Sequence, residues 1–192
     1  MSLPNDPTRR RFMRRATHAA GTAALAGLGL PQQARAAVAD ATGPVDRMLE
    51  MVHTHTRETI KLVYAVGSHY LPPSLQALDR FLRDHYTGDV GRIDPQLFDL
   101  LHRLRQTVGA RGPFEVISGY RCPNTNDRLR STRGGGVARH SLHMEGRAID
   151  VRCRGVPLAD LRDAAHALRG GGVGYYPQDG FVHLDTGRVR TW

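Results

Sequence analysis

Asp150 is the residue that most limits how this sequence can fold, because it interrupts an apolar stretch that otherwise predicts a buried strand. It stands between Ile149 and Val151 in GRAIDVRC, residues 146–153. Aspartate is depleted in strands, and a buried carboxylate without a partner is costly. Side chains alternate between the two faces of a strand, so Asp150 shares a face with the small Ala148 and not with its apolar neighbours. The fold must therefore supply a partner for this carboxylate.

A second segment shows the same alternation. In GFVHLDTG, residues 180–187, Val182 and Leu184 are predicted to share the apolar face of a strand. His183 and Asp185 then share the opposite, polar face. An imidazole and a second carboxylate are thus available from a neighbouring strand.

A further histidine can approach Asp150 from the other side. Gly146 separates His143 from the strand and permits a turn that carries the imidazole back toward it. Two histidines and one carboxylate, here His143, Asp150 and His183, form the ligand set of a catalytic zinc site whose fourth position stays open for water. Zinc lowers the pKa of such a water toward about 7.

A simpler interpretation makes Asp150 an ion-pair partner of Arg147 or Arg152 and both histidines structural. Spacing alone leaves the two interpretations open. The histidines that have no second ligand at a suggestive spacing are predicted to be surface or helix residues; they are His53, His55, His69, His85, His102 and His166.

Helices are predicted mainly in the first half of the chain and strands in the second, which indicates an α+β fold with a small antiparallel sheet and helices packed on it. In the first helix we expect Ser74 as the cap, and in the second Asp94 as the cap followed by Pro95. A long loop is expected from the third strand through Gly136. The predicted helices are 71–86, 93–109 and 157–168, and the predicted strands are 58–66, 114–121, 146–153, 172–176 and 180–187.

The first 36 residues resemble a twin-arginine export signal. Arg9 and Arg10 precede Phe12 and Met13, and the segment ends in a small-x-small cleavage pattern. Its apolar run, residues 19–30, is too short and too rich in glycine to span a membrane. We therefore expect export by the twin-arginine translocon, cleavage, a periplasmic location, and no integral membrane segment in the mature protein.

These features divide the chain into a signal peptide, a linker and one domain, residues 1–36, 37–46 and 47–192. The formal net charge is +9, but the first 36 residues hold six arginines and one aspartate. The remainder has 21 basic and 17 acidic residues, a balance too mild for a nucleic-acid-binding surface. Cys122 and Cys153 could pair in an oxidising compartment, and the sequence leaves that pairing open.

The motif around Asp150 is similar to one of a known family. Residues 141–150, SLHMEGRAID, resemble the Ser-x-His-x-x-Gly-x-Ala-x-Asp motif of D-Ala-D-Ala carboxypeptidase-type zinc peptidases, which share a fold with murein endopeptidases and the hedgehog signalling domain. VISGYRCPNTN, residues 116–126, and residues 171–192 resemble the YcbK-type branch, murein endopeptidase K. The resemblance runs from about residue 53 to residue 192.

The resemblance implies roles for individual residues. The metal ligands would be His143, Asp150 and His183, which hold one zinc ion. Arg121 would lie near the substrate, where a guanidinium binds a peptide carboxylate or polarises the scissile carbonyl. Ser141 would support the ligand loop and the substrate site.

The catalytic base of the family is missing from its expected place. Carboxypeptidase relatives carry Glu or Asp three residues before the last histidine ligand, where this chain has Gly180, and other relatives carry histidine where it has Phe181. The candidate bases are Asp185, Asp179 and His140. Asp185 could instead orient the imidazole of His183.

The function that follows from the resemblance is a zinc-dependent peptidoglycan endopeptidase that hydrolyses stem-peptide cross-links in cell-wall turnover. Two alternatives are a D,D-carboxypeptidase on the same substrate and a non-catalytic, zinc-containing peptidoglycan-binding module. The missing base motivates the second alternative.

Overall fold

The computed structural model describes residues 46–132 and 137–192. The predicted signal peptide, residues 1–36, and all of the predicted linker except Asp46 lie outside the described residues, so these boundaries stay predictions. Strand β1 begins at Asp46. No helix in the described ranges is both long enough and apolar enough to cross a membrane.

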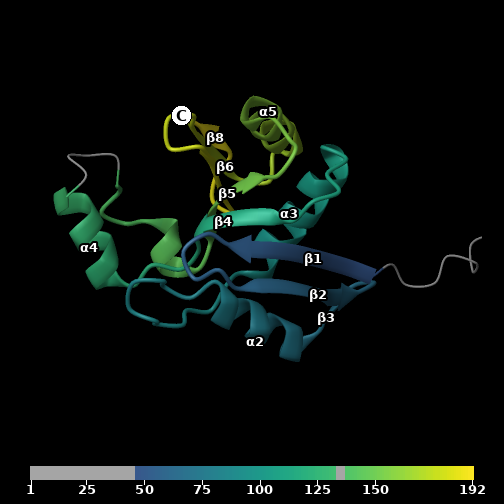
Figure 1. Ribbon diagram of the computed structural model, residues 1–192, viewed down its shortest axis with the longest axis horizontal. Helices are drawn as coiled ribbons and strands as arrows, with labels where there is room; N and C mark the ends of the chain where they lie inside the picture. The colour runs from purple at the N-terminus through teal and green to yellow at the C-terminus, as the bar shows by residue number, and fades with distance from the viewer. Residues whose placement is uncertain (1–45, 133–136) are drawn as a thin grey trace, which may run out of the picture. The chain divides into compact units, whose positions relative to one another are not determined.

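A mixed sheet forms the centre of the domain (Figure 1). In the described part of the chain it has eight strands in the order β3-β2-β1-β4-β5-β7-β6-β8. The pairs β1–β4 and β6–β8 are parallel and the other pairs antiparallel. The strands are β1 Asp46–His53, β2 Thr59–Val66, β3 His69–Tyr70, β4 Phe114–Ser118, β5 Ala148–Cys153, β6 Gly172–Tyr176, β7 Phe181–Asp185 and β8 Arg190–Thr191. The α+β class is confirmed, but the sheet is larger than the small antiparallel sheet expected.

Helices α2, α3 and α5 bury their apolar side chains in the same core as one face of the sheet. Helix α2 lies against β2, whereas α3 contacts β1 and α5, and α5 contacts β5, β6 and β7. The core includes Met51, Leu101, Val151 and Leu184, all fully buried. The helices are α2 Pro72–Phe81, α3 Pro95–Thr107, α4 Pro123–Thr132 and α5 Leu158–Leu168, with a short 3₁₀ helix, η1, at Leu142–Glu145.

The two predicted helix caps have different outcomes. Asp94 caps α3 as expected, since its carboxylate accepts a hydrogen bond of 3.0 Å from the amide of Gln96. Ser74 does not cap α2, which begins at Pro72 and shows no side-chain cap. Helix α2 also ends at Phe81, short of residue 86, because Asp84 binds the amides of Tyr86 and Cys122, both at 2.9 Å.

Helix α4 and strand β1 are among the elements absent from the sequence-based prediction. Helix α4 occupies part of the segment expected to be a loop, and in Figure 1 it stands at one end of the domain. It has few apolar residues and is anchored by the buried Thr125 and Asn126. Strand β1 was not predicted, although Leu49, Met51 and His53 alternate with more exposed neighbours. Cys122 and Cys153 are both buried and both free.

His53 corrects the expectation that the unassigned histidines lie on the surface or in helices. It ends β1 and is fully buried. Its Nδ1 accepts a hydrogen bond of 3.2 Å from the amide of His55. Burial, reinforced by His55, lowers the pKa of His53 to about 4. Burial lowers the pKa of the neighbouring His85 to about 4 as well.

The lowered pKa values of His53 and His85 predict that acid destabilises the domain. Their pKa values lie below the ordinary value of about 6.5, so the unfolded chain binds more protons than the folded one between these values. Stability should be complete above about pH 6.5 and should fall as the pH drops toward 4. Thermal unfolding in the presence of a chelator, over this pH range, measures the effect. The loss should be smaller in His53→Asn, and unchanged in the exposed control His166→Asn. An equal loss in all three proteins would contradict this assignment.

Candidate metal centre

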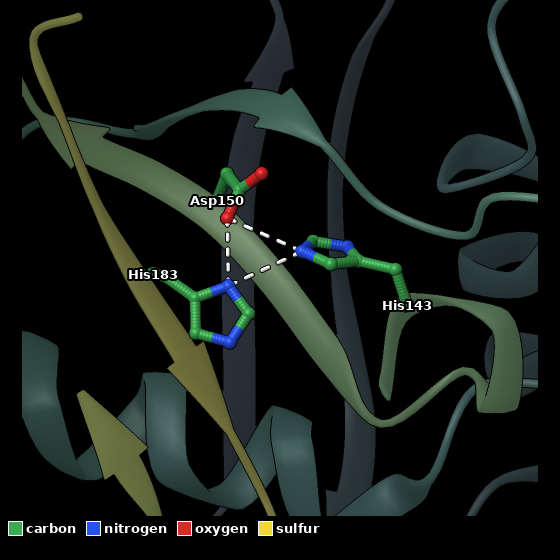
Figure 2. Close-up of side chains that lie close together, drawn as sticks. All are labelled: His143, Asp150 and His183. Carbon is green, nitrogen blue, oxygen red and sulfur yellow. Dashed lines mark hydrogen bonds and ion pairs between the residues drawn. The ribbon is translucent and has the colours of Figure 1, made fainter. Parts of the chain in front are cut away.

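The pairing of β5 with β7 fixes the first two side chains of the site. Asp150 lies directly opposite His183, and Ala148 lies opposite Asp185. Both pairs are on the face of the sheet opposite Val151 and the core, as the alternation predicts. The small Ala148 leaves space beside the carboxylate. Figure 2 shows the Asp150 and His183 side chains pointing toward one another from adjacent strands.

The 3₁₀ helix η1 carries the third side chain, His143, over the end of β5 (Figure 2). Ser141 caps η1, because its hydroxyl accepts a hydrogen bond of 3.4 Å from the amide of His143. Gly146 ends η1 in the left-handed conformation, with φ of 67°. A Cβ at that position would lie 1.9 Å from the carbonyl oxygen of Arg92. Only glycine therefore allows this turn.

Three donor atoms from these residues form a small triangle. His143 Nε2 lies 3.2 Å from His183 Nδ1 and 3.3 Å from Asp150 Oδ1, and His183 Nδ1 lies 2.9 Å from the same carboxylate oxygen. His143 and Asp150 are buried, and the side chain of His183 is 12% exposed. In the described ranges this is the one group of three or more such residues whose ligand atoms converge.

Hydrogen bonds on the far side of each ring direct a lone pair into this triangle. His143 Nδ1 lies 2.7 Å from the carbonyl oxygen of Gly119, which only accepts, so Nδ1 carries the hydrogen and Nε2 is free to ligate. Burial lowers the pKa of His143 to about 4 and keeps the ring neutral. His183 Nε2 lies 3.2 Å from Asp185 Oδ2, which leaves Nδ1 facing the triangle.

The triangle fits a divalent metal ion. Tetrahedral coordination with bonds of about 2.0 to 2.1 Å separates donors by about 3.3 Å, close to the observed edges. The site also attracts positive charge. Burial disfavours the charged form of His183, yet hydrogen bonds to Asp150 and Asp185 outweigh burial and raise the pKa of His183.

Arg121 binds the outer oxygen of Asp150. Its Nη2 donates to Asp150 Oδ2, and its Nε donates to the Ser118 hydroxyl at 2.8 Å. Burial opposes ionisation of Asp150, but His143, His183 and Arg121 together hold the pKa of this carboxyl well below its usual range. Asp150 is therefore an ionised candidate ligand whose second oxygen already has a hydrogen-bond partner. The alternative partners of the sequence interpretation are engaged elsewhere, Arg147 with Glu145 and Arg152 with Glu115.

Asp185 is fully buried beneath His183. Its carboxylate accepts hydrogen bonds from the amides of Gly172 and Gly187, at 3.0 and 2.8 Å, and from the guanidinium of Arg190. Burial favours the neutral acid, but His183 and Arg190 outweigh it and lower the pKa of Asp185. A carboxylate so fully occupied is in position to orient the His183 ring and is poorly placed to accept a further proton.

A cleft of about 710 Å³ opens above the three donor residues. Three of the residues singled out from the sequence, Ser141, His140 and Asp179, line it together with Arg121. Asp185 does not. The structure thus brings together every residue of the predicted site except that Asp185 lies behind His183 and away from the cleft.

Some contributors to the site were missed in the sequence. The Gly119 carbonyl acts through the backbone, which residue type does not reveal. Arg190, Tyr176 and Trp192 also line the cleft. The positions of Arg190 and Trp192 depend on the parallel pairing of β6 with β8, a long-range contact that no local spacing indicates.

An α+β domain that presents two imidazole nitrogens and a carboxylate at the floor of a cleft has the arrangement used by metal-dependent hydrolases. Comparisons with known proteins identify the family within this class. The family described as "Peptidoglycan L,D-endopeptidase MepK" matches residues 41–192. The chain belongs to this peptidase family, which confirms the resemblance to the murein endopeptidase K branch.

Individual relatives are similar over nearly the whole chain. The peptidoglycan L,D-endopeptidase MepK of Escherichia coli (strain K12) is 42% identical over 187 residues, 97% of this chain and 98% of that protein. The probable peptidoglycan L,D-endopeptidase MepK of Haemophilus influenzae is 39% identical over 166 residues, 86% of this chain and 89% of that protein.

The position of Asp185 predicts its effect on metal affinity. In Asp185→Asn the amide no longer fixes which His183 nitrogen carries the hydrogen, so we expect metal affinity to fall about tenfold to a hundredfold. Competition with a chromogenic chelator measures this. Asp163→Asn, at an exposed aspartate on α5, should match the wild type. Equal affinities for all three proteins would show that Asp185 does not orient the ligand.

A side chain at position 146 should clash with the backbone, and this effect can be measured separately from the strain of a positive φ. Gly146→Ala should lower both stability and metal affinity, because the new methyl group meets the Arg92 carbonyl and displaces η1. Gly155 also has a positive φ, of 80°, but open space around it. Gly155→Ala should therefore cost only about 1 kcal/mol and leave metal affinity unchanged. Denaturant unfolding and chelator competition on both variants distinguish the two effects; identical losses would contradict the steric explanation.

Proposed function

We propose that this chain is a zinc-dependent peptidoglycan endopeptidase that hydrolyses stem-peptide cross-links at the His143–Asp150–His183 centre. The main support for this proposal is that three donor atoms, His143 Nε2, Asp150 Oδ1 and His183 Nδ1, converge at the floor of a cleft. Membership of the L,D-endopeptidase family favours endopeptidase action over a carboxypeptidase or a non-catalytic module, and favours a scissile bond that joins an L-centre to a D-centre.

Zinc suits the donor set better than magnesium or calcium. Two of the three donors are imidazole nitrogens, which zinc binds well, whereas magnesium and calcium prefer oxygen donors alone. When bound, zinc supplies Lewis acidity at the scissile carbonyl and lowers the pKa of a water toward about 7.

The chain's own residues position these groups. Asp150 stays ionised because Arg121 binds its outer oxygen, and the His143 ring is held neutral by burial and by the Gly119 carbonyl. Arg121 also lines the cleft, so the same guanidinium places positive charge beside the substrate. We infer that this charge stabilises the negative charge that develops on the carbonyl oxygen. Ser141 caps η1 and also lines the cleft.

The proton acceptor is best sought among the cleft residues. Asp185 is occupied by hydrogen bonds from four residues, whereas His140 and Asp179 are exposed and face the cleft. We infer that one of these two accepts a proton during hydrolysis.

The variants His140→Ala and Asp179→Asn should therefore behave differently. One of them should lower kcat by about a hundredfold or more with full metal content, since a positioned base contributes roughly that much. Steady-state kinetics with metal analysis measures this. Wild-type kcat in both variants would exclude both residues as the base.

We infer a periplasmic location, with residues 1–36 as a twin-arginine signal that is cleaved. The paired Arg9 and Arg10 and the short apolar run support this proposal. Replacing both arginines by lysine should leave the protein in the cytoplasmic fraction. Unchanged periplasmic accumulation of the double variant would argue against this export route.

The proposed activity predicts a direct result on purified cell walls. Zinc-loaded protein should convert cross-linked muropeptides to uncross-linked ones, and His143→Ala should be slower by at least about a thousandfold because it removes a ligand. Chromatography of the digested sacculi measures both. Wall binding without release of monomers by the wild type would instead support a binding module, and loss of only a terminal residue from uncross-linked stems would support a carboxypeptidase.

A further inference from the structure

Trp192 presents a large apolar surface at the cleft. The residue lines the cleft and is 49% exposed, although aromatic side chains of this size are usually mostly buried. Its ring centroid lies 5.3 Å from that of the proposed metal ligand His183. An exposed indole beside a catalytic centre can act on whatever enters the cleft.

The indole is held firmly in this exposed position. Its Nε1 donates a hydrogen bond of 2.8 Å to the hydroxyl of Tyr176. Its backbone amide donates to the Val173 carbonyl at 3.2 Å, and its carbonyl accepts from the Tyr175 amide at 3.0 Å. The guanidinium of Arg190 lies 4.7 Å from the ring centroid. The ring therefore loses little further conformational entropy when a ligand packs against it.

Glycine at position 174 makes room for this arrangement. Gly174 pairs with His183 across β6 and β7. A Cβ at Gly174 would lie 2.7 to 2.8 Å from atoms of the Trp192 indole. The indole thus crosses the backbone beside the metal ligand, at a distance that only glycine allows.

Two more aromatic side chains extend the same surface. Tyr176 and Phe181 stack with ring centroids 4.7 Å apart, and both line the cleft. Together with Trp192 they form what we call the aromatic wall. Polar residues, including Arg121, His140 and Ser141, line the same cleft. The cleft therefore offers an apolar contact as well as charged ones.

We infer that the aromatic wall is a substrate-binding subsite, and that Trp192 packs against the aliphatic portion of the peptide residue next to the scissile bond. The inference rests on the proposed function. An extended peptide advances about 3.3 to 3.6 Å per residue, so a group bound at Trp192 lies within one or two residues of a bond held at His183. Aliphatic carbon chains and methyl groups bind well to aromatic surfaces because the contact removes apolar surface of both partners from water.

The chain contains a single tryptophan, so its fluorescence reports on this subsite alone. Zinc-loaded full-length protein is titrated with free stem tripeptide prepared from sacculi, and binding is measured in parallel by calorimetry. We expect a saturable shift of the emission to shorter wavelength, with the same dissociation constant as calorimetry gives. Calorimetric binding with unchanged emission would overturn the inference.

Kinetics of variants test the same subsite. Trp192→Ala should lower kcat/KM on cross-linked muropeptides by about tenfold to a hundredfold, as expected for loss of a buried aromatic contact. Trp192→Phe should stay within about fivefold of the wild type, since it keeps an apolar ring. Tyr86→Ala is the matched control: Tyr86 is 48% exposed and does not line the cleft, so its kcat/KM should not change.

Metal content separates substrate binding from support of His183. Zinc per chain should be unchanged in Trp192→Ala, with most of the loss in KM. A loss of zinc in proportion to activity would overturn the inference, because the indole would then serve the metal ligand. If the wild type shows the emission shift but cleaves no cross-link, the proposed function fails while the subsite stands; if it cleaves and Trp192→Ala cleaves equally well, only the subsite fails.

Discussion

The antiparallel register between β5 and β7 is the constraint on which the site depends. It places Asp150 opposite His183 on the face of the sheet that the helices leave free. A shift of one residue would turn the carboxylate toward the core and Val151 toward the cleft. The apolar residues that alternate with the site residues therefore determine the position of the proposed ligands as well as the stability of the core.

Charged and polar groups behind the three donor residues fix how these side chains are oriented and protonated. Three donors lie within 3.3 Å of one another, and each is prepared by a group behind it: a backbone carbonyl for His143, a guanidinium for Asp150 and a carboxylate for His183. Such outer partners set which nitrogen is free and how basic it is. Burying the anionic Asp150 beside two imidazoles is costly unless a positive charge accompanies it, either a proton on His183 or a cation.

Much of the site could be predicted from the sequence because it rests on local patterns. The alternation of apolar and polar residues around Asp150 and His183 predicted which face of the sheet each side chain occupies. Gly146 predicted the turn that brings His143 back toward β5. Other features depend on contacts distant in sequence. Helix α4 has too few apolar residues to show periodicity, α2 ends early because Asp84 binds backbone amides, and Trp192 reaches the cleft through the pairing of β6 with β8. The size of the sheet was underestimated because strands β1, β3 and β8 were not recognised.

The contact between Arg121 and Asp150 has a consequence for turnover. The negative charge of this ligand is already balanced by the guanidinium, and Arg190 balances Asp185 in the same way. A dication held by the proposed ligands would therefore keep most of its charge for the molecules in the cleft. Hydrolysis of an amide creates a new carboxylate at that place, so the acid product is attracted more strongly than the neutral amide it came from. Release of that product, and the ionic strength that weakens its attraction, would then help determine the rate.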